Sequence, residues 1–354
     1  MAYTSVDDPT ILFNTILYTG NDASNRGITG VNFAPDWVWI KKRNNAAGGV
    51  ISDTVRGAGK VLYSSETNAE GSESASFVSF DSDGYTISQD AGVGLNVNSH
   101  TYVGWNWKAG GSASSNSSGN ITSSVSANTT AGFSIVSYTA NGTNGVTVGH
   151  GLGVAPNMMI IKNRDNTGGG GTESWLVYHK SLGAHYKAGS LDGNFTSHDH
   201  PDYFNDTEPT SSVFSLGDGA NGNTSGEKYI AYCFTNIKGY SMMGSYTGNG
   251  STDGAYINLG FRPAWVMGKR TDVTNNWYMF DNKRSTFNLT DEKLRADTTA
   301  TENVDSAKAI DMLSNGIKIK SSDEEFNASN GTYIFMAFAE SPFTNSSGIP
   351  NNAR

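Results

Sequence analysis

The sequence has a single cysteine, Cys233, among its 354 residues. A disulfide within one chain needs two cysteines, so no internal disulfide framework can hold this fold. Cys233 lies within an apolar stretch, which predicts a buried thiol and not a catalytic one. The chain also lacks an apolar run near the ~18 residues that cross a bilayer. Its first nine residues contain no basic segment followed by an apolar core, so we expect no secretory signal peptide.

Positive charge is also scarce. Lysine and arginine number 24 against 33 aspartates and glutamates, which gives a formal net charge of -9. An acidic chain without a basic cluster is repelled by nucleic acid and by anionic bilayers. We therefore expect no nucleic-acid partner and no membrane insertion.

One phrase occurs three times in the chain. It runs from a proline to a lysine six residues later, with apolar and aromatic residues between them, at residues 35–41, 156–162 and 263–269. Repetition at this spacing predicts a triplicated structural unit. Proline cannot donate a hydrogen bond within a sheet, so the phrase predicts a strand that begins at the proline and ends with the lysine charge in solvent.

A second phrase follows each of these strands after a variable loop. It has the form Asp-x-x-Arg at residues 53–56 and 281–284, whereas the middle copy has His179 in place of the aspartate. The middle and last copies begin this phrase with Trp175 and Trp277, and the first copy lacks the tryptophan. A structural ion pair at a strand end is expected here, because a catalytic acid would not vary between copies and surface ion pairs are common.

Each copy closes with an aromatic strand, at residues 102–107, 229–234 and 333–338. An aromatic residue occupies the first and sixth positions of all three strands. Because side chains alternate along a strand, these two rings face opposite sides. Such a strand is covered on both faces, as in a sandwich of two sheets, and we place the rings in the core.

Two further local predictions follow from turn and helix patterns. Tyrosine-glycine and Asn-Gly turns near the start of each copy predict a tight hairpin that joins its first two strands. Residues 306–313 are the only segment with the pattern of a helix.

Together these patterns predict an all-β protein of three tandem, related β-sandwich domains, jelly-roll-like in form. The boundaries are an N-terminal arm at 1–15, repeat 1 at 16–109, a Gly/Ser-rich linker at 110–127, repeat 2 at 128–240, repeat 3 at 241–345 and a polar tail at 346–354. The linker has the composition of a flexible segment, although residues 120–125 alternate and could pair as an edge strand.

Motifs for catalysis and cofactor binding are weak. His198 and His200 could hold a transition metal on a strand, but no cysteine or third histidine follows at a ligand spacing. The Asp81–Gly84 segment lacks the distal glutamate of a calcium loop and predicts a turn. The glycines at 168–171 do not join a strand to a helix, so they predict no phosphate site. We expect no cofactor and no enzymatic activity.

Several phrases resemble a class of marine bacteriophage virion proteins. They include the opening residues 1–9, the strands at 17–20 and 35–41, the turn at 80–85, the aromatic strand at 102–108 and residues 126–136. Members of this class occur in phages of ocean bacteria, including cyanophages, and are usually labelled tail or tail-fibre proteins. The resemblance covers nearly the whole chain and implies a virion structural protein, made in the host cytoplasm, with other virion proteins as partners. It transfers no catalytic or binding residue.

Three roles remain open on this basis. The first is a tail fibre or receptor-binding component that contacts a host surface glycan or protein through variable loops at 163–174, 194–209 and 271–276; the candidate residues are Asn166, Glu173, His198, Asp199, His200, Asp202, Asp272 and Asn275. The second is decoration of the capsid, as a head fibre, knob or cement protein. The third is a glycan-degrading tailspike, although no catalytic motif in the sequence supports it. A homotrimer is expected for a fibre by analogy.

Overall fold

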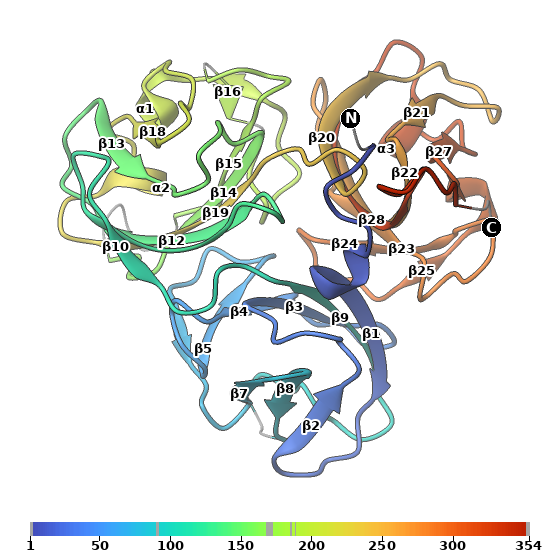
Figure 1. Ribbon diagram of the computed structural model, residues 1–354, viewed down its shortest axis with the longest axis horizontal. Coiled ribbons are helices and arrows are strands. Elements are labelled where there is room, and N and C mark those ends of the chain that lie inside the picture. Colours follow the sequence, from blue (N-terminus) through green and yellow to red (C-terminus); the bar gives the residue numbers. More distant parts are fainter. Residues whose placement is uncertain (1–2, 90–91, 168–172, 185, 188, 352–354) are drawn as a thin grey trace.

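The computed structural model describes residues 3–89, 92–167, 173–184, 186–187 and 189–351. Within these residues the protein is all-β, and its helices are single short turns. Figure 1 shows three lobes around a common centre, with repeat 1 in blue, repeat 2 in green and repeat 3 in orange. None of the helices in the described ranges has the length and apolar character that crossing a bilayer requires.

Each lobe contains one six-stranded antiparallel sheet. In strand order, the three sheets are β1 (Phe13–Thr19), β9 (Thr101–Trp107), β3 (Trp37–Lys42), β4 (Val50–Asp53), β5 (Lys60–Tyr63) and β6 (Gly71–Ser72); β10 (Ser114–Asn116), β11 (Ser123–Asn128), β12 (Phe133–Thr139), β19 (Lys228–Phe234), β14 (Met158–Asn163) and β15 (Leu176–His179); and β20 (Ser241–Thr247), β28 (Thr332–Pro342), β22 (Phe261–Arg270), β23 (Tyr278–Asp281), β24 (Glu292–Arg295) and β25 (Asn303–Val304). The first strand of each repeat pairs with its closing strand, which pairs in turn with the Pro-Lys strand.

A smaller antiparallel sheet accompanies each large one. These sheets are β2 (Arg26–Thr29), β8 (Gly84–Ile87) and β7 (Phe77–Asp81); β13 (Val146–Gly149) and β18 (Val213–Leu216); and β21 (Tyr256–Asn258), β27 (Gly316–Ile319) and β26 (Ile310–Leu313). The remaining elements are the pair β16 (Tyr186–Lys187) and β17 (His198–Asp199), the 3-10 turns η1 (Pro9–Ile11) and η2 (Ser306–Lys308), and the helical turns α1 (Pro201–Phe204), α2 (Ala220–Asn223) and α3 (Glu324–Asn327).

The repeated proline-to-lysine phrase forms the equivalent strands β3, β14 and β22. The first two strands begin two residues after their proline, whereas Pro263 lies inside β22 at a register shift, where a missing N–H is tolerated. The lysines do not end in solvent as predicted. Lys41, Lys162 and Lys269 have no exposed side-chain surface, because the neighbouring repeat covers the end of each strand.

The closing strands are buried on both faces. In repeat 1, Tyr102 belongs to the cluster between the large and small sheets, whereas Trp107 belongs to the central cluster. In repeat 2, Tyr229 and Phe234 divide in the same way. The prediction that the first and sixth rings lie in the core on opposite faces is therefore confirmed for repeats 1 and 2, and both rings of repeat 3, Tyr333 and Phe338, are buried.

The faces of the large sheets that point inward share one hydrophobic core. This central cluster includes Trp37 of repeat 1, Tyr232 of repeat 2 and Phe338 of repeat 3, all buried. The Trp37 ring lies 4.7 Å from the Tyr232 ring, and Trp107 lies 5.5 Å from Trp265 of repeat 3. Aromatic rings of this size dominate the hydrophobic burial, so the repeats stabilise one another.

Three local predictions are wrong. The positive-φ turns at Gly142 and Gly250 exist, but the strands on either side of them lie in different sheets and do not form a hairpin. Residues 306–313 form a 3-10 turn followed by strand β26, and not a helix. The Gly/Ser-rich segment is not a flexible linker throughout, because β10 and β11 extend the large sheet of repeat 2. Of the alternating residues 120–125, residues 123–125 pair with β10, and β10 is the edge strand.

Candidate functional site

The three buried lysines lie at equivalent joints between repeats. Each ammonium donates to a backbone carbonyl of the adjacent repeat: Lys41 to Thr298 at 2.7 Å, Lys162 to Thr67 at 2.7 Å and Lys269 to Asn194 at 3.3 Å. Each also donates to carbonyls of its own repeat. Because burial disfavours the charged form, the pKa of all three falls to about 8.

The Asp-x-x-Arg pairs are part of the same joints. The side chains of Asp53 and Arg56 are fully buried and 2.5 Å apart, and Tyr232 of repeat 2 donates to the Asp53 carboxylate at 2.7 Å. In repeat 3 the Asp281–Arg284 pair repeats this geometry, with Trp105 of repeat 1 as the donor. The predicted ion pairs are present, but they are buried at inter-repeat joints and not on the surface.

His179 occupies the third of these joints. Its Nε2 lies 3.2 Å from the carbonyl oxygen of Phe335 in repeat 3, and burial lowers its pKa to about 4. The ring is therefore neutral at physiological pH and makes a hydrogen bond where the other repeats have an ion pair. All three copies of this phrase hold one repeat to the next.

The predicted surface loops are only partly exposed. His198, Asp199 and His200 are exposed and Asp202 is half-buried, as a surface loop requires. Asp272 is exposed and pairs with Arg270 at 2.9 Å. Asn275 is half-buried at the joint, where its carbonyl accepts from Lys269.

Asn166 and Glu173 contradict the prediction that they face outward. Their exposed fractions are 6% and 8%. The Asn166 amide donates to the carbonyl of Thr67 at 2.6 Å, and its oxygen accepts from the backbone N–H of Glu173. The glycines at 168–171 lie outside the described residues.

The histidine pair is arranged around a tyrosine. The Tyr203 ring contacts both His198 and His200, at centroid distances of 5.7 Å and 5.4 Å, and His200 caps the first turn of α1. Among the described residues, no three metal-ligating side chains converge. In the turn between β7 and β8, the Asp81 carboxylate accepts from the Thr86 hydroxyl, and the Asp83 carboxylate accepts from the backbone N–H groups of Gly30 and Asn32.

Cys233 is fully buried on β19, as predicted. Burial raises the pKa of its thiol to about 12. The sulfur therefore stays protonated at physiological pH, and a thiol is a poor nucleophile.

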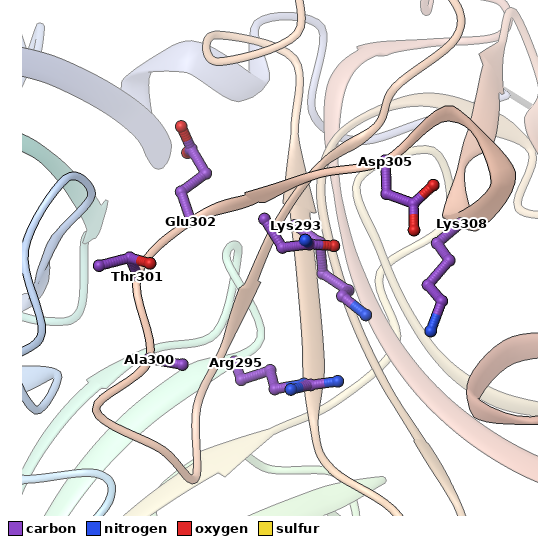
Figure 2. Close-up of a pocket in the computed structure, with 8 residues that line it drawn as sticks. Lys293, Arg295, Ala300, Thr301, Glu302, Asp305 and Lys308 are labelled. Carbon is purple, nitrogen blue, oxygen red and sulfur yellow. The ribbon is translucent and has the colours of Figure 1, made fainter.

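A polar hollow of about 350 Å³ lies on repeat 3. It borders the joint with repeat 1, where the backbone of residues 299–302 hydrogen-bonds to Arg43 and Ala47. Its lining comes from β24, from residues 300–305 and from Lys308 at the end of η2. Figure 2 shows the side chains of Arg295, Asp305 and Lys308 turned toward the same space, whereas Glu302 points away. Glu302 instead pairs with Arg43 of repeat 1 at 2.7 Å.

Buried charged residues lie beside the residues that line this hollow. Lys293 is 3% exposed and hydrogen-bonds to Glu325, which is also buried. Arg295 donates twice to the same carboxylate, at 3.0 Å and 3.2 Å, and its side chain remains 31% exposed. Lys308 pairs with Asp323 at 2.8 Å and is 34% exposed.

Sequence reasoning missed this hollow. Lys293, Arg295 and Lys308 are separated along the chain by ordinary loop residues, and their carboxylate partners lie a further hairpin away. No sequence pattern indicated it, because the correspondence of position 293 to an apolar position of repeat 1 follows from strand pairing, and the two positions lie at different distances from Asp281 and Asp53.

Comparison with known proteins gives a family and no activity. No curated protein matches the sequence. The sequence profile described as "Domain of unknown function (DUF7483)" matches residues 8–342, and so spans all three repeats. The chain therefore belongs to the DUF7483 family.

Proposed function

We propose that this chain is a non-enzymatic structural protein on the outside of a bacteriophage particle, and that it contacts the host surface as part of a tail fibre or receptor-binding assembly. The resemblance to marine phage virion proteins supports this role. Partners are then other virion proteins at one side of the molecule and a host glycan or protein at the other.

The joints between repeats are the observation that carries the proposal. The fully buried ion pairs and the buried lysines all hold one repeat to the next. These charged groups therefore have a structural role. Exposed polar residues gather on short surface segments such as residues 198–200, in β17 and just before α1. Rigid frameworks that carry variable loops are a common arrangement for recognition.

Two experiments test the proposal. Immunogold labelling or a reconstruction of the particle should locate the chain on the tail, and purified protein added to host cells should reduce phage adsorption. A chain that is missing from the particle, or that leaves adsorption unchanged, contradicts it. New reducing ends after incubation with host polysaccharide would instead favour the tailspike enzyme.

Capsid decoration is the second candidate, because the three repeats share one core and form a compact body in place of an extended fibre (Figure 1). The hydroxyl of Tyr3 donates to the Gly260 carbonyl at 2.9 Å, and Thr4 donates to the Lys238 carbonyl at 2.9 Å. Residues 3–4 therefore pack on the end of repeat 2 and on repeat 3, as part of the same body. Labelling on the capsid faces would select this role over the fibre.

A further inference from the structure

The three repeats provide an internal comparison for the hollow in repeat 3. Glu325 precedes the closing tyrosine Tyr333 by eight residues, as Gly94 precedes Tyr102 and Asn221 precedes Tyr229. The carboxylate at this position therefore belongs to repeat 3 alone.

The register of the sheets shows which residues of β5 in repeat 1 correspond to those of β24 in repeat 3. Leu294 pairs with Met279 in repeat 3, and Leu62 pairs with Ile51 in repeat 1. Met279 and Ile51 each precede the joint aspartate by two residues, so they are equivalent. It follows that the neighbours of Leu294 correspond to those of Leu62. Lys293 then occupies the position of Val61, and Arg295 that of Tyr63.

Repeat 1 shows that this position does not need a charge. Val61 is fully buried in the core of its repeat. In repeat 3 the same site contains the buried Lys293–Glu325 pair. Replacing a buried ion pair with apolar residues is often neutral or stabilising, so stability does not explain why repeat 3 has the pair.

The pair instead positions the groups that reach the hollow. Glu325 holds the Arg295 guanidinium by two hydrogen bonds, which leaves the exposed part of that side chain directed at the open space. Lys308 is held by Asp323 at the other side. We propose that this hollow is a binding site for a polyhydroxyl ligand, a neutral saccharide unit, held by Arg295, Asp305 and Lys308.

The mixture of charges selects this ligand class. The lining combines cationic donors with the carboxylate of Asp305 and the amide of Asn303. A sugar hydroxyl both donates and accepts, so it satisfies both kinds of group. A volume near 350 Å³ lies at the lower end of the range for small-molecule sites, about 300 to 1,000 Å³. Ala300 is the only apolar lining residue, which disfavours an apolar ligand.

A simple anion fits less well. The three cations of the lining already pair with Glu325 or Asp323, Asp305 adds a further carboxylate to the lining, and the whole chain carries a net charge of -9. No surplus of positive charge is left to attract an isolated anion. The biological source of the sugar, a host surface glycan, rests on the proposed function, whereas the ligand class rests on the hollow alone.

Saturation-transfer NMR on the full chain tests the site. The probes are neutral tetrasaccharides of glucose, galactose, mannose and N-acetylglucosamine, with tetragalacturonate as the anionic comparison, each at about 1 mM, the upper limit of a specific weak site. We expect at least one neutral tetrasaccharide to bind. Binding of tetragalacturonate alone, or of no probe, overturns the proposal.

Variants then locate the binding. Lys308→Ala should weaken binding by about tenfold, the effect of one charge-assisted hydrogen bond. The combined variant K293V/R295Y/E325N, which places the residues of repeats 1 and 2 in repeat 3, should abolish binding. Lys60→Ala on β5 of repeat 1, a partly exposed lysine on the corresponding strand, is the control and should bind as the parent chain does.

Binding unchanged in Lys308→Ala overturns the assignment to this hollow, even if the combined variant fails to fold. The result is also separable from the proposed function. Sugar binding is measured on purified protein, and the location of the chain on the particle is measured independently of it.

Discussion

At the scale of single residues, the tryptophan missing from repeat 1 has a physical replacement. The indoles of Trp175 and Trp277 donate across joints, to the carbonyls of Tyr63 and Ser190. Repeat 1 has Gly49 at this position, and a Cβ there would lie 2.5 Å from Nε1 of Trp39. Trp39, from the adjacent strand β3, therefore fills the space.

Gly49→Ala should destabilise the protein by about 1 to 3 kcal/mol, because the added methyl overpacks the core against Trp39. The free energy of unfolding from urea titration measures the effect. Gly27→Ala is the matched control, since a Cβ at Gly27 meets no atom within 4 Å. Equal stability of the two variants would contradict this account of the missing tryptophan.

The buried lysines predict a stability that rises at alkaline pH. Their pKa is about 8 in the folded chain and near 10.5 in the unfolded chain, so between these values the unfolded chain binds more protons. The free energy of unfolding therefore increases with pH, by about 1 kcal/mol per lysine from about pH 8 to about pH 9. Above this window Cys233 opposes the gain, because its raised pKa makes the folded chain keep a proton.

Urea unfolding at both pH values measures this gain. Lys162→Met should remove about one third of it, because one of three equivalent groups no longer titrates. A parent chain whose stability is flat or falling over this window would show that the lysines are not held as the structure indicates.

At the scale of elements, the segment that leaves the closing strand of repeats 1 and 2 is anchored by the residue after the repeated proline. Asp36 accepts from the backbone N–H of Ala109 at 2.8 Å, and Asn157 accepts from that of Asn236 at 2.9 Å. Repeat 3 has Ala264 at this position. The acceptor occurs only where the chain continues into another repeat, so it orients the connection.

The buried pair at the end of β4 should be sensitive to removal of one partner. Asp53→Ala leaves the Arg56 guanidinium buried without its main counter-ion, which costs about 3 to 5 kcal/mol. Lys228→Ala breaks the exposed Lys228–Asp165 pair and should change stability by less than about 0.5 kcal/mol. Chemical denaturation distinguishes the two, and a small effect of Asp53→Ala would argue against a tight joint.

At the scale of the whole molecule, the joints form a closed ring. Lys41 of repeat 1 reaches repeat 3, Lys269 of repeat 3 reaches repeat 2, and Lys162 of repeat 2 reaches repeat 1. The three-fold arrangement that a fibre trimer would build from separate chains is thus present within one chain, and its apolar faces are already covered by the central cluster.

We therefore expect a monomer of 37.6 kDa in light scattering coupled to size exclusion, although a trimer was predicted by analogy. Calorimetry should show one unfolding transition, because the repeats share a core. A mass three times larger, or separate transitions for the three repeats, would contradict the closed ring.

The sequence by itself determined the all-β class, the repeated strand phrases and the burial of the aromatic closing strands. These features depend on alternation and turn chemistry, which are local. Only the tertiary structure decided which charged side chains are buried. The sequence predicts Lys41 and Asp53 as surface groups, because each lies at the end of a strand of its own repeat. The adjacent repeat then buries them. The hollow at Lys293 likewise depends on contacts between segments far apart in the chain, which no local pattern encodes.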